Sequence, residues 1–152
     1  MSQARRKMQR IDPLIKAKKS IMESEATVLS EIRRKKVELV AKMKEYQRLY
    51  MQGIEKLNKE RGSANRTNLL TLEENLDYVK DQWHDFFLAV RKTEAQEKAQ
   101  LAELERAQRS LKSFEKLQDN YLELFVAEQK KVEQKLTDET SIRRFTTQKQ
   151  PL

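Results

Sequence analysis

Apolar side chains recur at alternating steps of three and four residues from Leu69 to Ile142, and no step in this stretch needs correcting. Fifteen of the 22 positions reached in this way are apolar. A heptad pattern held for this length predicts one uninterrupted helix whose narrow apolar stripe packs against a partner helix. We therefore expect residues 69–142 to form one helix of a coiled coil.

A second periodic stretch precedes it. Asp12 and Pro13 predict a helix start, because aspartate caps free backbone amides and proline is tolerated at the first helical position. From there the apolar stripe has a mean step of about 3.58 residues, which indicates weak supercoiling. Gly53 lies in this helix, either as a tolerated glycine or as a point of close backbone approach. The predicted stripe consists of Leu14, Lys18, Ile21, Glu25, Val28, Ile32, Lys35, Leu39, Met43, Tyr46, Tyr50, Ile54 and Leu57.

Turn and capping residues separate the two periodic stretches. Gly62 suits the left-handed position after a helix, and Thr71 with Glu74 matches a capping box. The candidate N-cap residues are Asn65, Thr67 and Asn68. A connection this short makes its helices antiparallel neighbours. The predicted fold is all-α, a long two-helix antiparallel coiled-coil hairpin whose second helix is longer than the first.

The hairpin is expected to occupy the whole chain as a single domain. Its predicted parts are a basic N-terminal arm at 1–12, the first helix at 13–61, a turn at 62–68, the second helix at 69–142 and a flexible basic tail at 143–152.

Reflection about a turn near Ala64 pairs residues whose numbers add up to about 130. The predicted apolar pairs are Leu57 with Leu72, Tyr50 with Val79, Tyr46 with Trp83, and Met43 with Phe86. The predicted polar pairs are Lys35 and Lys36 with Glu94 and Glu97, and Glu25 with Arg106. Because polar breaks of opposite charge coincide, we expect this register to hold within a few residues.

The same register leaves the end of the second helix without a partner. Pro13 pairs with about residue 117, so roughly 25 residues, nearly 40 Å of helix, remain uncovered. Exposed apolar groups on a lone helix usually mark a docking surface. The apolar residues near the base of this overhang are Tyr121, Leu122, Leu124, Phe125 and Val126, and the N-terminal arm could cover part of them.

The composition agrees with long helices rather than with a globule. Charged residues make up 37% of the 152 residues, against roughly a quarter in typical domains. The net charge of +8 is unevenly distributed: residues 1–68 carry +10, residues 69–142 carry −5 and the tail carries +3. This asymmetry favours attraction between the two helices over a free polycation.

Without cysteine there is no disulfide or thiolate metal site. No apolar run approaches the length of a membrane span, so we expect a cytoplasmic protein without membrane insertion.

The sequence contains no motif that indicates catalysis or cofactor binding. It has no phosphate-binding loop, and its one histidine, His84, has no oriented partners for acid–base chemistry and is interpreted as a surface or seam residue. Basic runs at 5–10 and 33–36 have no interleaved aromatic residues for stacking on nucleic acid. We expect no enzymatic activity, no cofactor, no metal and no nucleic-acid partner.

Three short motifs stand out along the predicted helices. The first is Glu45-Tyr-Gln-Arg-Leu-Tyr50, shortly before a Gly-Ser-Ala-Asn-Arg turn. The second is Leu72-Glu73 followed by Trp83, and the third is Leu111-Lys-Ser-Phe-Glu-Lys-Leu-Gln-Asp119, leading to Asp138-Glu139 and Arg143-Arg144. Over nearly the whole chain these features resemble the FliJ family of flagellar export proteins. The tyrosine pair with the Asn-Arg turn is the most specific of them.

The resemblance implies a soluble part of the flagellar type III export apparatus, similar to the central stalk of a rotary ATPase. The implied partners are a hexameric export ATPase, the export-gate membrane protein and free export chaperones. Ring docking would fall on residues 1–20 and 117–145, and gate contact on Tyr46 and Tyr50. The implied ring-binding residues are Tyr121, Leu122, Leu124, Phe125, Arg5, Arg6 and Arg10. The stalk would promote ring assembly and activity and would lie at the cytoplasmic face of the inner membrane through its partners.

Two alternatives stay open at this point. The injectisome relatives of the family share its architecture, although the tyrosine pair and the Asn-Arg turn favour the flagellar branch. A generic coiled-coil adaptor would self-associate through the same end residues, whereas a stalk is expected to be an elongated monomer on its own. The predicted register also places Tyr46 and Tyr50 in the seam, while a binding role needs their hydroxyl edges at the surface.

Overall fold

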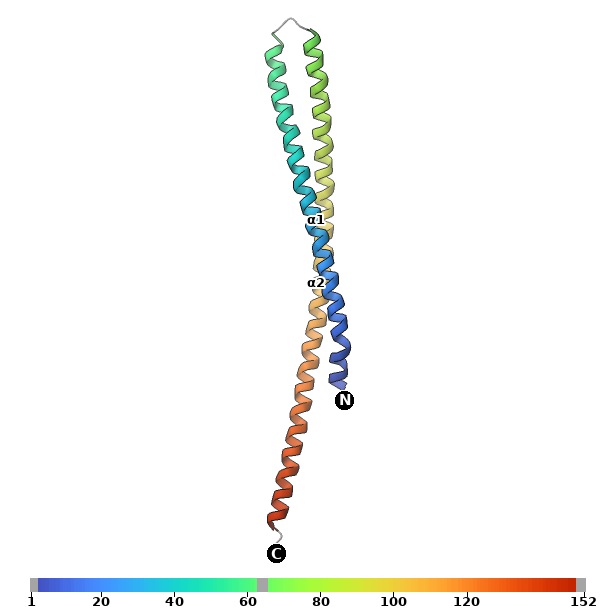
Figure 1. Cartoon of the computed structure of the whole chain (residues 1–152), viewed down its shortest axis with the longest axis vertical. Helices are drawn as coiled ribbons and strands as arrows, with labels where there is room; N and C mark the ends of the chain where they lie inside the picture. The colour runs from blue at the N-terminus through green and yellow to red at the C-terminus, as the bar shows by residue number, and fades with distance from the viewer. Residues whose placement is uncertain (1–2, 63–65, 150–152) are drawn as a thin grey trace. The chain divides into compact units, whose positions relative to one another are not determined.

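The computed structural model describes residues 3–62 and 66–149, and these form two α-helices (Figure 1). Helix α1 is Gln3–Glu60, with 58 residues, and helix α2 is Arg66–Lys149, with 84 residues. The fold is the predicted all-α antiparallel hairpin with a longer second helix. The packing divides the chain into two units. The unit next to the turn is Ser24–Glu105, which we call the turn unit. The other is Met1–Glu23 together with Arg106–Leu152, which we call the terminal unit.

Helix α1 begins ten residues before the predicted start. Pro13 lies inside the helix, so its missing N–H removes one hydrogen bond, at a cost of about 3 kcal/mol. Ala4 and Ile11 are nevertheless only 4% and 3% exposed. Burying one isoleucine side chain contributes about 1.5–3 kcal/mol, so the contacts of this first segment offset the proline penalty. Residues 3–12 of the expected basic arm are therefore part of α1.

The longer α1 also changes which of its residues face α2. Every second position of the predicted stripe is displaced by one residue in the first half of α1, because Ile15 is 5% exposed while Leu14 is 49% exposed. The positions between them, such as Lys18, face α2 as predicted. In the turn unit Leu29 is buried and Val28 is exposed in the same way. Alternating steps of four and three from Ala4 reach every inward-facing seam residue as far as Leu57. The repeat in α1 is therefore a regular heptad rather than the looser period predicted from Leu14.

The predicted stripe of α2 is confirmed from Leu69 to Glu128, where every seam position is buried or partly buried. Even the polar position Thr93 is only 3% exposed, and its hydroxyl donates a hydrogen bond to the backbone oxygen of Ala89 at 2.8 Å. From Gln129 to Thr146 every residue is exposed. The repeat in the sequence therefore continues beyond the part of α2 that α1 covers.

The helix ends near the turn differ from the capping scheme. Neither glycine of the chain has a positive φ, so Gly62 does not take the left-handed conformation predicted for it. Thr67 and Asn68 lie within α2, and the Thr71 hydroxyl donates to the backbone oxygen of Thr67 at 3.0 Å instead of capping a helix. Asn65, the remaining cap candidate, is outside the described residues. At its other end α2 continues through Arg143 to Lys149, where a flexible tail was expected.

The terminal unit has a small apolar core built from both helices. Ile11, Ile15 and Leu111 are buried, with Met22, Phe114 and Tyr121 packed around them. Gln118 Nε2 donates a hydrogen bond to Asp12 Oδ1 at 2.8 Å, so these two residues are paired as the predicted register requires. Because α1 begins at Gln3, it covers α2 as far as Glu128 rather than to about residue 117.

In the turn unit the predicted register is correct to within a few residues. Lys36 Nζ lies 3.5 Å from Glu97 Oε2, an ion pair that falls where the two polar breaks were expected to meet. Gln100 Nε2 donates to the backbone oxygen of Glu25 at 3.1 Å and also to the Glu25 carboxylate.

Gly53 is a point of close helix approach. A Cβ atom added to it would lie 2.9 Å from Leu76 Cδ2, inside van der Waals contact. The leucine therefore packs on the bare backbone, which supports the second of the two interpretations of this glycine.

Candidate partner-binding surfaces

The two tyrosines singled out in the sequence lie in the seam of the turn unit. The Tyr46 ring stacks on Phe86 with centroids 5.4 Å apart and an interplanar angle of 17°. The Tyr50 ring lies 5.5 Å from Trp83 at 41°. Each tyrosine thus contacts the α2 residue that lies one seam position beyond its predicted partner. Both side chains are partly buried, so their rings hold the helices together while part of each remains at the surface.

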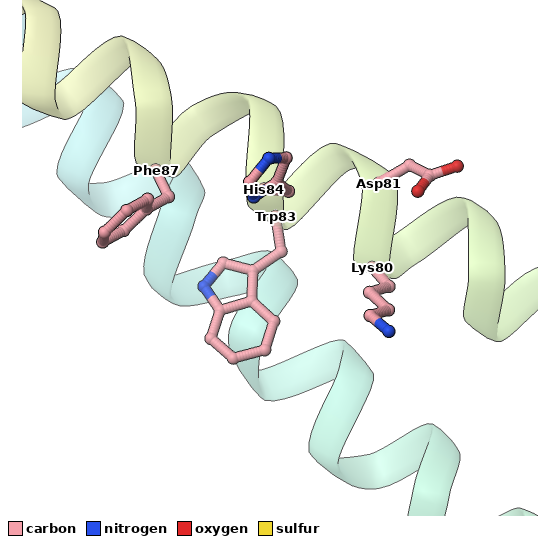
Figure 2. A pocket seen from close by; sticks show the side chains of 5 residues that line it. All are labelled: Lys80, Asp81, Trp83, His84 and Phe87. Carbon is pink, nitrogen blue, oxygen red and sulfur yellow. The ribbon is translucent and has the colours of Figure 1, made fainter.

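An open groove lies beside this aromatic cluster on α2. Its volume is about 460 Å³, and Figure 2 shows Trp83 pointing from α2 towards α1, with Phe87 one turn further along α2. The lining residues are Lys80, Asp81, Trp83, His84 and Phe87. Phe87 is 40% exposed, and the Arg91 guanidinium lies 5.2 Å from its ring centroid. The turn unit therefore has an aromatic surface next to its tyrosines.

Sequence reasoning did not identify this groove, although it contained a usable signal. Phe86 and Phe87 are consecutive, and two neighbouring residues of a helix cannot both point into one narrow seam. Phe86 takes the seam position, which leaves Phe87 at the surface. His84 is exposed, as expected of a surface residue. Among residues 3–62 and 66–149, no group of three or more potential metal ligands lies together.

The four candidate ring-docking residues of α2 divide into two kinds. Tyr121 and Phe125 occupy seam positions and are partly buried against α1. Leu122 and Leu124 are 46% and 55% exposed. The first turns of α1 cover part of this set, as the sequence allowed for the N-terminal arm, because α1 reaches further than the register from Pro13 predicted. Two of them pack inside the terminal unit and two face outward.

The three candidate arginines lie on the first turns of α1. Arg5, Arg6 and Arg10 are exposed there, alongside Lys7, whose ammonium group lies 5.6 Å from the centroid of the Tyr121 ring. The structure therefore brings the candidate arginines and the candidate apolar residues together in one unit. This end of the chain combines cationic side chains with exposed leucines.

Beyond Glu128, α2 continues without cover from α1, a segment we call the extension, residues 129–149 (Figure 1). It is about 30 Å long at the rise of an α-helix. Its apolar side chains are more than half exposed: Val132 at 54%, Leu136 at 58%, Ile142 at 63% and Phe145 at 57%. Exposed apolar groups at helical spacing are typical of a surface that binds another protein. Neither described helix is long and apolar enough to cross a membrane.

The fold and these surfaces define a helical-hairpin interaction protein, in which aromatic and cationic patches accompany a protruding helix. The model of the family described as "Flagellar FliJ protein" matches residues 7–150 of this chain. The chain belongs to the FliJ family and is a protein of flagellar type III export, in a family of non-enzymatic components of that machinery. No curated protein and no solved structure matched it.

Proposed function

We propose that this chain is the stalk of the flagellar type III export apparatus. In this proposal its terminal unit is seated in the hexameric export ATPase ring and promotes the assembly and activity of the ring. The hairpin also links the ring to the export-gate membrane protein. Membership of the FliJ family supports a role in flagellar export and favours the flagellar system over the injectisome alternative.

The extension is the observation that carries the ring-docking part of the proposal. A single helix with Val132, Leu136 and Ile142 exposed has its apolar side chains free of cover from α1, so they are available to a surrounding protein. Arg143 and Arg144 add positive charge to the same segment. A ring that encloses the helix would bury these apolar groups from several sides. The neighbouring Leu122 and Leu124 would extend the contact towards Arg5, Arg6 and Arg10.

The gate contact is proposed at Tyr46 and Tyr50. Their rings are held by Phe86 and Trp83, so their positions are determined before any partner binds. A preorganised side chain loses less conformational entropy on binding than a mobile one. The adjacent groove lined by Trp83 and Phe87 would add apolar contact area. We propose export chaperones as further partners, and a location at the cytoplasmic face of the inner membrane through these contacts.

The proposal is tested with the purified chain and the hexameric export ATPase. We expect the chain to raise the hexamer content and the ATPase activity. The double variant Leu124→Ala with Phe125→Ala should bind the ring at least about tenfold more weakly, or about 1.4 kcal/mol. Circular dichroism should show nearly unchanged helicity. The double variant Leu70→Ala with Val37→Ala is the matched control, because both residues are exposed in the turn unit.

Unchanged ATPase activity with no co-elution of the chain and the ring would contradict the stalk. Equal ring binding by the Leu124 and Phe125 variant would leave the stalk standing but would remove this surface from the dock.

A self-associating adaptor is the second candidate function, because the exposed apolar groups of the extension could equally pair with a second copy. Light scattering over a range of concentrations separates the two. A stalk stays monomeric, whereas an adaptor forms a concentration-dependent dimer and has no affinity for the ring.

A further inference from the structure

One side of the terminal unit has an apolar surface that the two-helix seam does not use. The residues immediately before buried or partly buried seam positions are Leu14 and Ile21 on α1, and Leu117 and Leu124 on α2. They are 49%, 48%, 38% and 55% exposed. In an antiparallel pair, residues that precede seam positions on the two helices lie along the same side. These four residues, here the side face, therefore form one continuous strip.

The structure supports this arrangement at the centre of the strip. Leu14 and Leu117 line one cavity of about 240 Å³, whose floor includes Ile11, Phe114 and Tyr121. Leu14 and Ile21 are seven residues apart, as are Leu117 and Leu124, so each pair lies on one face of its helix. Because the two helices run antiparallel, the two pairs extend in opposite directions from Leu14 and Leu117, and the cavity opens within a strip that is about four helical turns long.

The opposite side of the same unit has a different character. The residues that follow seam positions there include Asp12, Lys19 and Glu115, which are charged, and one apolar residue, Leu122. The carboxylate of Asp12 accepts a hydrogen bond from Gln118. A helix that packs only against one partner needs apolar residues at two of every seven positions. A third apolar position on one side is typical of helices that pack against an additional helix. The asymmetry indicates that the side face has a further helical partner.

The charges around the cavity indicate the chemistry of that partner. Its only charged lining residues are Lys7 and Arg10, and both are cationic. The Lys7 ammonium lies 5.6 Å from the Tyr121 ring centroid, and that of Lys18 lies 5.5 Å from Phe114. These contacts hold two ammonium groups beside the apolar strip. We propose that the side face binds an amphipathic helix of another protein, with leucine-like residues facing Leu14 and Leu117 and acidic residues flanking them.

A second copy of this chain fits the side face less well. The most exposed apolar helix available from a second copy is the extension, whose six basic residues outnumber its three acidic ones, Glu133, Asp138 and Glu139. The basic residues are Lys130, Lys131, Lys135, Arg143, Arg144 and Lys149. Placing these cations beside Lys7 and Arg10 would be repulsive. The proposal goes beyond ring docking, because Leu14, Ile21 and Leu117 are not among the proposed ring-binding residues.

The test uses a fluorescent three-heptad peptide with leucine at its two seam positions and glutamate at the flanking positions. Fluorescence anisotropy measures its affinity for the full chain. We expect binding that weakens as salt is raised, because part of it comes from exposed charges. A peptide with lysine in place of glutamate, and a scrambled peptide with the same acidic composition, should each bind at least about tenfold more weakly.

Variants then locate the binding site. Leu14→Ser with Leu117→Ser should lower the affinity at least about tenfold, while Val37→Ser with Leu70→Ser, two exposed positions of the turn unit, should leave it unchanged. Lys7→Glu with Arg10→Glu should weaken binding and reduce its salt dependence. Circular dichroism of each variant establishes that the helices still form. Peptide binding is measured without the ATPase, and ATPase stimulation is measured without the peptide, so that failure of the side face and failure of the stalk give different results.

Three outcomes would overturn the proposal. Equal affinity for the scrambled peptide would mean that only net charge is recognised. Unchanged binding by the Leu14 and Leu117 variant would place the peptide elsewhere. A dimer of the chain that this variant abolishes would assign the side face to a second copy.

Discussion

The turn unit and the terminal unit continue one heptad repeat but use it differently. In the turn unit every seam residue of α2 has cover from α1, and aromatic pairs such as Tyr50 with Trp83 fill the contact. In the terminal unit the cover ends at Glu128 while the repeat goes on. A heptad pattern therefore indicates where a helix can be packed, and the length of its partner decides where it is packed. The difference separates a part of the chain that stabilises the hairpin from a part that is available for binding.

The largest expected effect is on the packed side of this comparison. Trp83→Ala removes a large ring from the contact with Tyr50. The free energy of unfolding should fall by about 3 kcal/mol. This value is at the lower end for such truncations, because the indole is only partly buried. Leu88→Ala, five residues beyond Trp83 and at a position that is 52% exposed, should change the free energy of unfolding by less than about 0.5 kcal/mol. Urea denaturation followed by circular dichroism measures both. Equal losses would mean that the aromatic pairs do not hold the turn unit together.

A smaller effect distinguishes the observed seam of α1 from the predicted one. Ile15 is 5% exposed and Leu14 is 49% exposed. Ile15→Ala should therefore lower the free energy of unfolding by about 2 kcal/mol, and Leu14→Ala by less than about 1 kcal/mol. Thermal or urea unfolding of the two variants gives the comparison directly. A larger loss of unfolding free energy for Leu14→Ala than for Ile15→Ala would support the predicted stripe, in which Leu14 faces α2.

The smallest expected effect concerns Gly53. Alanine in place of a helical glycine usually stabilises by about 1 kcal/mol, but here the added Cβ would press on Leu76. Gly53→Ala alone should therefore stabilise the chain by clearly less than that. In a Leu76→Ala background, where the neighbouring side chain is gone, the full gain should return. A double-mutant cycle by urea denaturation measures the difference, and identical gains in both backgrounds would show that the close contact has no energetic consequence.

Much of this fold could be predicted from the sequence, because fifteen of the 22 seam positions of α2 are apolar and no other stripe on that helix fits a regular heptad. Helix α1 was ambiguous in its first half. Neighbouring apolar pairs such as Leu14–Ile15 and Val28–Leu29 satisfy two stripes equally well, and choosing Pro13 as the helix start selected the wrong one. Only the packing of α1 against α2 shows which of the two stripes faces inward. That packing includes Ala4 and Ile11, which lie before Pro13 and are buried.

The candidate site residues were also predicted better where they lie in the seam than where they lie on the surface. Tyr46 and Tyr50 were placed correctly in the seam, with partners displaced by one step. The apolar residues near Tyr121 were expected on the overhang, with partial cover by the N-terminal arm. Tyr121 and Phe125 are packed against α1, which extends further along α2 than predicted. The groove at Phe87 was not predicted, since a seam pattern describes what faces inward and says little about the outer surface.

The central claim is that the extension engages the export ATPase ring and contributes little to the hairpin itself. A chain that ends at Glu128 lacks the extension and retains every covered seam position. Its free energy of unfolding should stay within about 0.5 kcal/mol of that of the full chain, because the removed residues make few packing contacts. Its stimulation of the export ATPase should be lost. Full stimulation by the shortened chain would contradict the claim.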